Sequence, residues 1–342
     1  MRVHIRTGIV LALSVGMLAW FLRGANLREV WTEIQNGRVG LLALAVGVTG
    51  MTYVLRALRW QYLLRPLGSP PFSAVFRTTV IGFAASTLLP ARAGEVVRPY
   101  LLARRSGFSA TSAFATIILE RLLDLVMVLL LFGFYLAFYT PAVAAGHSAT
   151  FTALKSGGLL AAVASVAGLI FMMVAAGHPE KLARWALRVE RVLPVTMANA
   201  VAHLVRTFLE GLAVVRQPRR LAIAGLLSLP LWLSIALGIW STSRAFHIEM
   251  SYPGAFLMMA VLVVGVAVPT PGAVGGFHKA YQIGAVAFFG VANDRAVGAA
   301  LVLHAISFVP VTIAGAIFLA QEGLSLSRVR GLAASDAPGD AS

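Results

Sequence analysis

The stretch TSAFATIILERLLDLVMVLLLFGFYLAFY, residues 111–139, decides what kind of protein this is. It is apolar except for Glu120, Arg121 and Asp124. A helix of about 29 residues, rising about 1.5 Å per residue, reaches about 44 Å and exceeds the roughly 30 Å hydrocarbon core of a bilayer. The segment therefore predicts a membrane-spanning helix that carries three charges at the depth of the lipid.

The composition of the whole chain agrees with this prediction. Of its 342 residues, 59% are hydrophobic and 12% are charged, whereas a soluble domain has roughly 25% charged residues. This composition excludes a soluble enzyme. The chain has no cysteine, which excludes disulfide frameworks, thiolate metal sites and cysteine nucleophiles.

Further apolar runs on both sides of residues 111–139 predict an all-α, polytopic helix bundle of about six to eight spans. Continuous runs cover residues 8–22, 39–58, 157–176, 221–243 and 296–320, and interrupted runs cover residues 75–102 and 253–290. The first run has the flanking charges of a signal peptide but no cleavage site, so we expect an uncleaved helix. Residues 1–324 form a single transmembrane domain in this interpretation, and residues 325–342 form a disordered tail.

The distribution of basic residues predicts the orientation. The net charge is +15, from 28 Lys and Arg against 13 Asp and Glu. These bases lie between apolar spans and match no recognition motif, so we expect membrane lipids and not nucleic acid as partners. Most of them fall in alternate loops, which predicts both termini on the cytoplasmic side of a bacterial inner membrane.

Residues 178–220 form the one sizeable stretch between spans. Leu182 and Trp185 recur near one side of a helix, while Arg184 and Arg188 follow another side. This pattern favours a helix lying on the inner leaflet over a plain solvated loop. Through this helix the protein would contact lipid-biosynthesis enzymes, and a homo-oligomer is a further arrangement that the sequence leaves open.

The charges inside residues 111–139 are the first functional candidates, because an unpaired charge in a membrane costs several kcal/mol. Glu120, Arg121 and Asp124 either form an ion-pair network with Arg92 or Arg98, or contact a substrate directly; the two roles are compatible. Arg56 and Arg59, at the end of the run 39–58, are assigned to the inner interface.

The first interruption, LLPARAGEVVRP at residues 88–99, is too polar and too broken for one ordinary span. Its proline and glycine residues predict unwound backbone at Pro90, Gly94 and Pro99. Arg92 and Arg98 would then present forked donors suited to a phosphate, with Glu95 orienting either arginine. The alternative is a cytoplasmic loop whose arginines merely follow the inside bias.

A second interruption, VPTPGAVGGFHK at residues 268–279, favours the first of those interpretations. Two broken segments, one in each half of the chain, are typical of a midplane binding site in transporters and fit an inverted repeat. The N-terminal ends of half-helices favour an anionic ligand. The candidate substrate-binding residues here are Pro269, Pro271, Gly272, Gly275, Gly276 and His278.

Several other chemistries find no support in the sequence. No Walker or Rossmann motif follows a strand, no pair of histidines has metal-ligand spacing, and no Ser–His–acid set is evident. We therefore expect no cofactor and no metal.

Four ordered motifs resemble the lysylphosphatidylglycerol synthase transmembrane family, also called flippase-like membrane proteins. They are Arg56-Ala57-Leu58-Arg59-Trp60, Leu89-Pro90-Ala91-Arg92-Ala93-Gly94-Glu95, Leu119-Glu120-Arg121-Leu122-Leu123-Asp124, and Pro269-Thr270-Pro271-Gly272 with Gly275-Gly276. The resemblance covers residues 8–320. It departs from the family pattern at His278, where the family often has an acidic residue.

The resemblance implies a module that moves a lipid headgroup between leaflets. Bifunctional members add a soluble aminoacyl-transferase domain that uses aminoacyl-tRNA, and this sequence carries no such domain, so lysine transfer is not expected. Standalone relatives are associated with hopanoid, isoprenoid-lipid or glycolipid pathways. The leading hypothesis is thus a translocase for an anionic, polyprenyl-linked, hopanoid or glycolipid headgroup, driven passively or by an ion gradient through the buried carboxylates. A membrane-embedded lipid-modifying transferase and a scaffold of a lipid-synthesis complex remain the alternatives.

Overall fold

The computed structural model describes residues 12, 14–89, 93–139, 148–178, 195–267 and 270–322. Helices are the regular elements of these residues, and no strand occurs among them. After a helical stretch at residues 14–22 they are, in chain order, α2 (Leu27–Gln35), α3 (Val39–Leu64), α4 (Phe72–Leu88), α5 (Gly94–Ser106), α6 (Ala110–Tyr139), α7 (Ser148–Gly177), α9 (Val195–Gly211), the 3-10 turn η4 (Ala213–Arg216), α10 (Pro218–Ala245), α11 (Gly254–Val266), the 3-10 turn η5 (Pro271–Ala273), α12 (Gly276–Phe289) and α13 (Asn293–Gln321).

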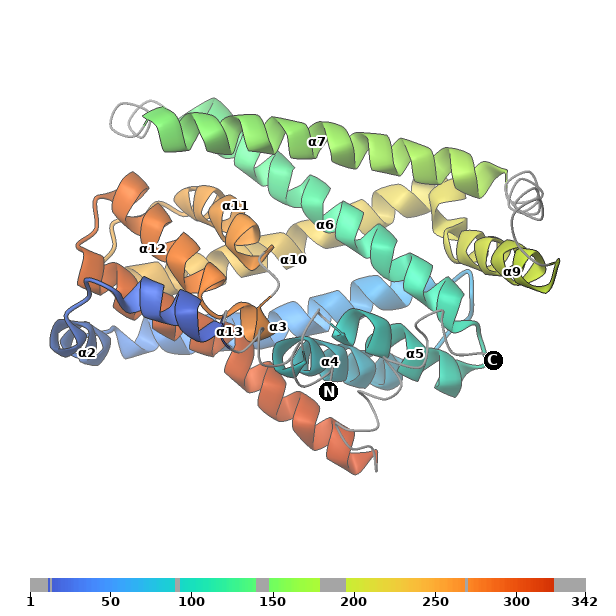
Figure 1. The fold of residues 1–342 in the computed structure, drawn as a ribbon, viewed down its shortest axis with the longest axis horizontal. Coiled ribbons are helices and arrows are strands. Elements are labelled where there is room, and N and C mark those ends of the chain that lie inside the picture. The colour runs from blue at the N-terminus through green and yellow to red at the C-terminus, as the bar shows by residue number, and fades with distance from the viewer. Residues whose placement is uncertain are drawn as a thin grey trace.

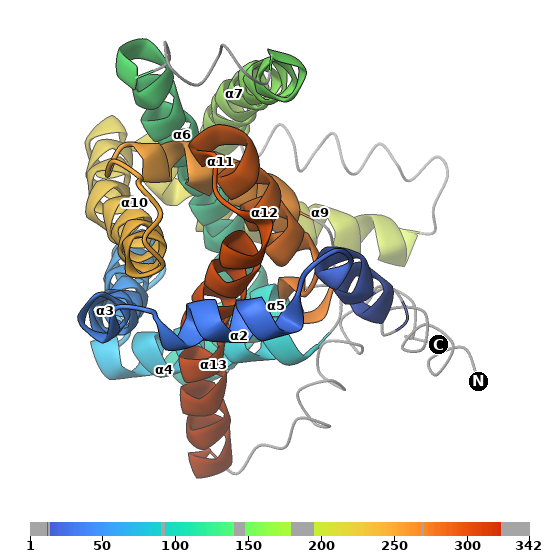
Figure 2. The ribbon, with the colours of Figure 1, turned by 90° about the vertical axis from the view of Figure 1, so that its left-hand side faces the viewer.

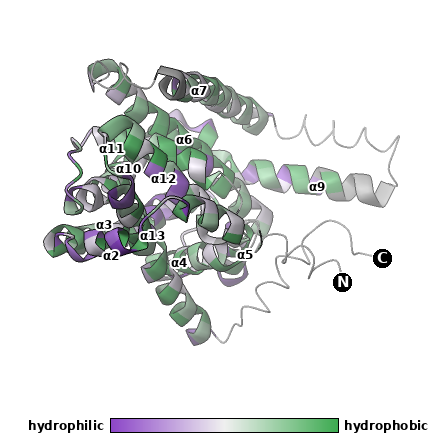
Figure 3. Ribbon diagram, turned by 60° about the vertical axis from the view of Figure 1, so that its left-hand side comes forward, coloured by the Kyte–Doolittle hydropathy of each residue, from purple (hydrophilic) through white to green (hydrophobic). Residues whose placement is uncertain are grey.

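Five helices of the described residues are long and apolar enough to cross a membrane, namely α3, α6, α7, α10 and α13. Two shorter apolar helices, α4 and α11, belong to the interrupted segments. In Figure 3 the long helices α6, α7 and α13 are coloured mainly as hydrophobic. The prediction of an all-α, polytopic membrane bundle is confirmed.

The helices pack around α6, which crosses the molecule obliquely (Figure 1). α3 packs along α10, α4 packs along α13, and α6 contacts α5, α7, α9, α10 and α11. α7 lies at the edge of the bundle in both views (Figures 1 and 2). The centre of the molecule is therefore bordered by α3, α4, α6, α10, α11 and α13.

Two hydrophobic cores form on either side of the charged turn of α6. One core takes residues 113–123 of α6 together with buried side chains of α3, α9 and η4. The other takes residues 128–135 together with those of α10, α11, α12 and α13. Asp124 lies between the two sets, so the predicted charges sit where one core ends and the next begins.

We predicted two broken elements, and the helices on either side of each break pack against each other as a hairpin. Each hairpin has glycines where its two helices approach most closely. A Cβ atom at Gly94 of α5 would overlap the carbonyl oxygen of Gly82 of α4. A Cβ atom at Gly265 of α11 would likewise meet the carbonyl oxygen of Gly276 of α12. The close approach of the two helices in each hairpin therefore depends on the missing side chains.

The backbone departs from two sequence predictions in the first hairpin. Pro99 does not interrupt a helix but lies inside α5. Gly94 is helical and supports packing, whereas we predicted unwound backbone. In the second hairpin the prediction is confirmed, because Gly272 and Gly275 adopt positive φ angles of 59° and 86°, a region that favours glycine.

The described chain also extends helix α3 beyond the predicted span. We placed residues 56 and 59 at the inner interface after a run ending at residue 58, but α3 continues to Leu64. The side chain of Arg59 is completely buried between helices, whereas its position at the inner interface stays a prediction. Carboxylates of α6 compensate the arginine charges, so the helix continues through them.

Part of the segment 178–220 lies outside the described residues, including Leu182, Trp185 and the arginines at 184 and 188. The same is true of Arg92, Pro269 and the tail 325–342. The described remainder of residues 178–220 contains α9, η4 and the first residues of α10. A position of this segment on the inner leaflet stays a prediction.

Candidate functional site

A cluster of charged side chains occupies the centre of the bundle, where α6 meets α3 and α5. Glu120 lies at its middle and is completely buried. Arg98 donates from Nη1 and Nη2 to the two carboxylate oxygens of Glu120, each at 3.2 Å. Arg59 and Arg121 approach the same carboxylate at 3.3 and 3.0 Å.

Asp124, one turn further along α6, is the second carboxylate of the cluster. It accepts hydrogen bonds from Nη1 of Arg59 at 2.6 Å and from the indole of Trp232 at 2.9 Å. Arg121 lies 3.2 Å from it. The i,i+4 spacing of the two acids places them on one side of α6, so that Arg59 binds both.

Aromatic and hydroxyl groups hold the arginines in place. The guanidinium of Arg98 lies 3.8 Å from the ring centre of Trp60, and the Trp60 indole donates to Thr116 at 3.0 Å. Arg59 also donates to Ser228 of α10 at 2.8 Å. The predicted network with Arg98 is therefore present, and it joins α3, α5, α6 and α10.

The cluster carries more positive than negative charge. Arg56, Arg59, Arg98 and Arg121 stand against Glu120 and Asp124, which leaves two positive charges. Glu95, which borders the same cavity, reduces the excess to one. A site with this balance favours an anion.

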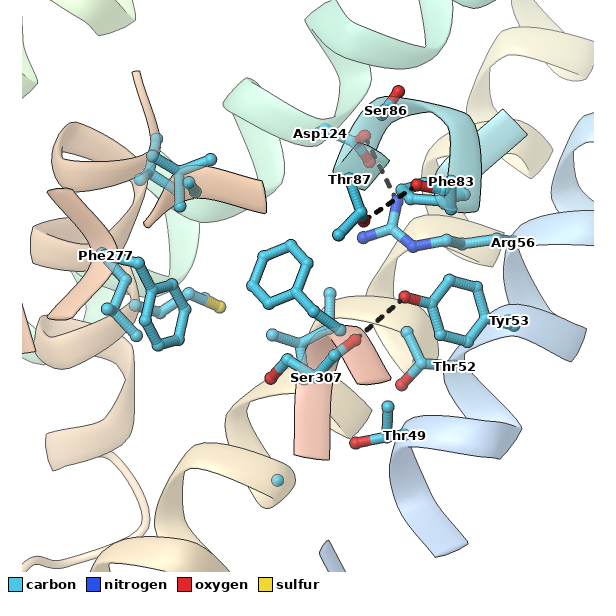
Figure 4. Close-up of a pocket in the computed structure, with 18 of the residues that line it drawn as sticks. Thr49, Thr52, Tyr53, Arg56, Phe83, Ser86, Thr87, Asp124, Phe277 and Ser307 are labelled. Atoms are coloured by element: carbon cyan, nitrogen blue, oxygen red, sulfur yellow. Dashed lines mark hydrogen bonds and ion pairs between the residues drawn. The ribbon is translucent and has the colours of Figure 1, made fainter. Parts of the chain in front are cut away.

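A cavity of about 470 Å³ opens beside the cluster. Figure 4 shows Tyr53 and Arg56 entering it from α3, Thr87 from the end of α4, and Phe277 from the opposite side. Ser307 of α13 lies next to Tyr53, whose hydroxyl donates to the Ser307 carbonyl oxygen at 3.3 Å. Its charged lining groups are Arg56, Glu95, Arg98, Arg121 and Asp124. This volume lies within the range of roughly 300–1,000 Å³ typical of small-molecule pockets.

Arg56 differs from the other arginines of the cluster. Its nearest carboxylate oxygen, on Asp124, is 3.9 Å away, and its buried Nη1 has no hydrogen-bond partner among the described residues. The group lies over the ring of Phe83, 4.9 Å from its centre. Arg56 is therefore the cavity-lining arginine that has no hydrogen-bonded carboxylate among the described residues.

The remaining cavity wall has a polar and an apolar part. The polar part carries three hydroxyl groups that donate to carbonyl oxygens of their own helices, those of Thr49, Thr87 and Ser307. Because their protons are already used, these hydroxyl oxygens can only accept hydrogen bonds from a ligand in the cavity. The apolar part comes from α6, α10 and α11 and includes Leu125, Val128, Ile235, Met259, Leu262 and Val266. Such a wall suits a ligand with a polar head and a hydrocarbon portion.

The two hairpins meet at the cavity wall. A Cβ atom at Gly272 would lie 3.2 Å from Cγ2 of Thr87, the last turn of α4. Behind Gly272, Nε2 of His304 donates to its carbonyl oxygen at 2.7 Å. The break in each half of the chain therefore contributes to one shared site.

Arg59 and Glu120 belong to the buried network without lining the cavity, and Arg56 lines it. The other predicted site residues fall into three groups. Gly94, Glu95, Arg98, Gly272, Arg121 and Asp124 line the cavity. Gly275, Gly276 and His278 are buried in the second hairpin but do not line it, and the position of the Pro271 side chain is not described. Arg92 and Pro269 lie outside the described residues.

Sequence reasoning missed two of the residues that matter here. Arg56 was placed at the interface although it belongs to a quoted motif, and His304 was set aside for lack of metal-ligand spacing. A useful signal was available for His304. It is one of two histidines, with His278, that lie inside otherwise apolar segments of the C-terminal third.

The comparisons with known proteins agree with the membrane architecture. The model of the lysylphosphatidylglycerol synthase TM region matches residues 8–315, and the chain belongs to this family. The chain is also similar to the glycosyltransferase AglD of Haloferax volcanii, with 27% identity over 129 residues. That match covers 37% of this chain and 20% of AglD, so the chain spans about a fifth of that relative's length.

Proposed function

We propose that this multi-pass member of the lysylphosphatidylglycerol synthase transmembrane family binds an anionic lipid headgroup in its central cavity and moves it between leaflets. The observation that carries the proposal is Arg56, a cavity-lining arginine without a hydrogen-bonded carboxylate. A buried cation of this kind is costly unless a ligand anion completes its pairing.

The headgroup contacts in this proposal differ from those that the sequence suggested. Arg98 uses both terminal nitrogens on Glu120, so it positions the carboxylate and has little to offer a phosphate. Arg56 and the half-exposed Arg121 have unused donors. We therefore assign the anion to these two arginines, with the hydrocarbon part of the lipid against α11.

The breaks at both sides of the cavity support movement of the ligand. Unwound backbone is tolerated at membrane depth where it lines a cavity, and transporters often place such segments at their binding site. The contact between Gly272 and Thr87 joins the two breaks. Separation of the hairpins at this contact would open the cavity.

Lipid binding tests the proposal. Native mass spectrometry of the purified protein with phosphatidylglycerol, which carries one negative charge, and phosphatidylcholine, which is zwitterionic, gives the preference for an anion. Arg56→Gln is expected to reduce that preference at least about tenfold, because a charged hydrogen bond contributes about 1.5–3 kcal/mol. Arg65→Gln removes the same charge from an exposed position just after α3 and should leave the preference unchanged. Equal preference in the wild type and Arg56→Gln would refute the assignment.

A second measurement distinguishes transfer of the lipid between leaflets from covalent modification of the lipid. Proteoliposomes with a fluorescent anionic lipid report its transfer between leaflets, and mass spectrometry of the same lipid reports any covalent change. A translocase moves the lipid without altering its mass. A lipid-modifying transferase would change the mass, and a scaffold for lipid-synthesis enzymes would do neither.

We further propose that the protein lies in a bacterial inner membrane with both termini on the cytoplasmic side. The absence of cysteine makes labelling of single introduced cysteines straightforward. Asn36→Cys, between α2 and α3, should react from outside the cell, and Gln217→Cys, before α10, should react after the inner side is exposed. The reverse pattern would overturn this orientation.

A further inference from the structure

Two histidines stack against each other directly behind the cavity wall. His278 comes from the first turn of α12 and His304 from the middle of α13, and their ring centres are 4.3 Å apart. His278 is buried. Neither ring takes part in the lipid contacts proposed above.

The hydrogen bonds of the two rings define where their protons lie. Nε2 of His304 donates to the carbonyl oxygen of Gly272 at 2.7 Å, because a carbonyl can only accept. Nδ1 of His278 accepts from the backbone N–H of Gly275 at 3.2 Å, so its own proton is on Nε2. Nδ1 of His304 has no hydrogen-bond partner among the described residues and carries a free lone pair.

The groups packed around the pair are mostly aromatic and neutral. Phe21 of the first helical stretch, Phe277 of α12 and Phe308 of α13 contact the rings. The nearby charged group is Lys279, whose ammonium donates to Gln282 at 2.9 Å and lies 4.8 Å from the ring centre of Trp20. From α4 the pair is approached, through Gly272, by the uncharged Thr87.

The carboxylates of the bundle are poor alternatives as proton carriers. Glu120 is approached by three arginines and Asp124 by Arg59, Arg121 and the Trp232 indole. A proton on either acid would remove those ion pairs and leave guanidinium groups uncompensated. Glu95, which is only partly buried, is the remaining carboxylate of the described cavity wall.

We propose that His278 and His304 form a binding site for one proton, which is taken up at Nδ1 of His304. Uptake changes the charge of the pair from zero to +1 and breaks no existing hydrogen bond. A second proton would have to enter at Nδ1 of His278. That atom is engaged by Gly275 and faces an imidazolium whose ring centre is 4.3 Å away, so the pair holds a single proton.

The bound proton strengthens the wall between the two hairpins. An imidazolium donates a charge-assisted hydrogen bond, which is roughly twice as strong as a neutral one. His304 would then hold Gly272, and with it the contact to Thr87, more firmly in acid than in base. The existence of this proton site does not depend on a lipid ligand. The further role of the bound proton as the coupling ion of lipid movement rests on the proposed function.

Hydrogen–deuterium exchange of the full-length protein in nanodiscs tests the proton site without any substrate. Exchange of residues 270–280, corrected for the intrinsic pH dependence, is compared at about pH 4.5 and about pH 8. This range includes the lower pH at which a charge enters an apolar surrounding. The wild type should show roughly fivefold higher protection at the lower pH, because the hydrogen bond to Gly272 becomes charge-assisted. Protection that is independent of pH, or that falls in acid, would overturn the proposal.

Three variants test whether the pH response comes from His304. His304→Gln retains a donor for Gly272 but cannot take up a proton, so it should fold and lose the pH response. His278→Gln should retain part of it. His203→Gln, a matched change at an exposed histidine of α9, should retain all of it. A pH response that survives in His304→Gln would place the proton elsewhere, with Glu95 the next group to vary.

The coupling role is tested separately in proteoliposomes with an imposed pH gradient. Wild-type lipid transfer should change with the direction of the gradient, and transfer by His304→Gln should not. Gradient-independent transfer by the wild type would overturn the coupling role. If no lipid moves at all, the proposed function fails while the exchange experiment still decides whether the proton site exists.

Discussion

The two hairpins of the bundle share a backbone plan but place different chemistry at the cavity and behind its wall. α4 and α5 close on Gly82 and Gly94, and α11 and α12 close on Gly265 and Gly276. The first hairpin contributes Arg98, which joins the network of full charges around Glu120. The second contributes His278, which stacks on His304 among aromatic rings.

This difference indicates a division of tasks between the hairpins. A fixed network of arginines and acids is rigid, because removing any member leaves a buried charge unpaired. Neutral imidazoles can change charge without breaking such a network. The first hairpin is thus suited to fix the network beside which Arg56 and Arg121 can hold an anion, and the second is suited to respond to protons.

The largest expected effect comes from removing a charge at the first hairpin's network. Arg59→Met keeps most of the side-chain volume but leaves Glu120 and Asp124 with one fewer partner. Because breaking a buried pair costs about 3–5 kcal/mol, we expect a loss of that size in the free energy of unfolding, measured by denaturation in mixed micelles.

The matched control for this change is Arg244→Met at the end of α10. Arg244 pairs with the exposed Glu249, and exposed pairs contribute about 0–1 kcal/mol. If Arg59→Met and Arg244→Met both lose less than about 1 kcal/mol, the buried acids do not need Arg59 as a partner. The first hairpin would then not differ from the second in carrying a rigid charge network.

The network also shows what sequence could and could not predict. Hydropathy identified the long helices and both breaks, and the charges within residues 111–139 identified α6 as the centre of the site. Hydropathy ended the preceding span at Leu58, before Arg59, because the partner of that arginine, Asp124, lies 65 positions away in the chain. Pairing between helices is not visible in a local window of sequence.

The glycines and histidines illustrate the same limit. Gly94 was assigned to unwound backbone, but the structure uses it for a close helix crossing that depends on the position of Gly82. His304 acts on a carbonyl 32 positions away, at Gly272. In both cases the residue type was visible in the sequence, whereas its task depends on which helix lies opposite.

A smaller effect should follow from a side chain at either glycine crossing. Gly94→Ala and Gly265→Ala both place a Cβ against a carbonyl oxygen of the partner helix, and overpacking costs about 1–3 kcal/mol. The Cβ would lie closer to a carbonyl oxygen at Gly94 than at Gly265, where the distance would be 2.5 Å, so we expect both variants to lose free energy of unfolding and Gly94→Ala to lose more.

Gly50→Ala in α3 and Gly133→Ala in α6 serve as controls, because a Cβ atom there meets nothing within 4 Å. These should be neutral or slightly stabilising, by up to about 1 kcal/mol. A loss at one crossing only would show that the two hairpins do not share a packing principle.

The smallest effect is expected from the basic residue of the second hairpin, Lys279. Its ammonium is directed to Gln282 and Trp20 and does not line the cavity. Lys279→Met should therefore change the free energy of unfolding by less than about 1 kcal/mol and leave the binding of phosphatidylglycerol unchanged. Lys155→Met on the exposed surface of α7 controls for the lost charge. Lys279→Met could instead lower anionic-lipid binding as strongly as Arg56→Gln while Lys155→Met leaves it unchanged. That result would show that Lys279 itself binds the anion and that the second hairpin also supplies an anion site.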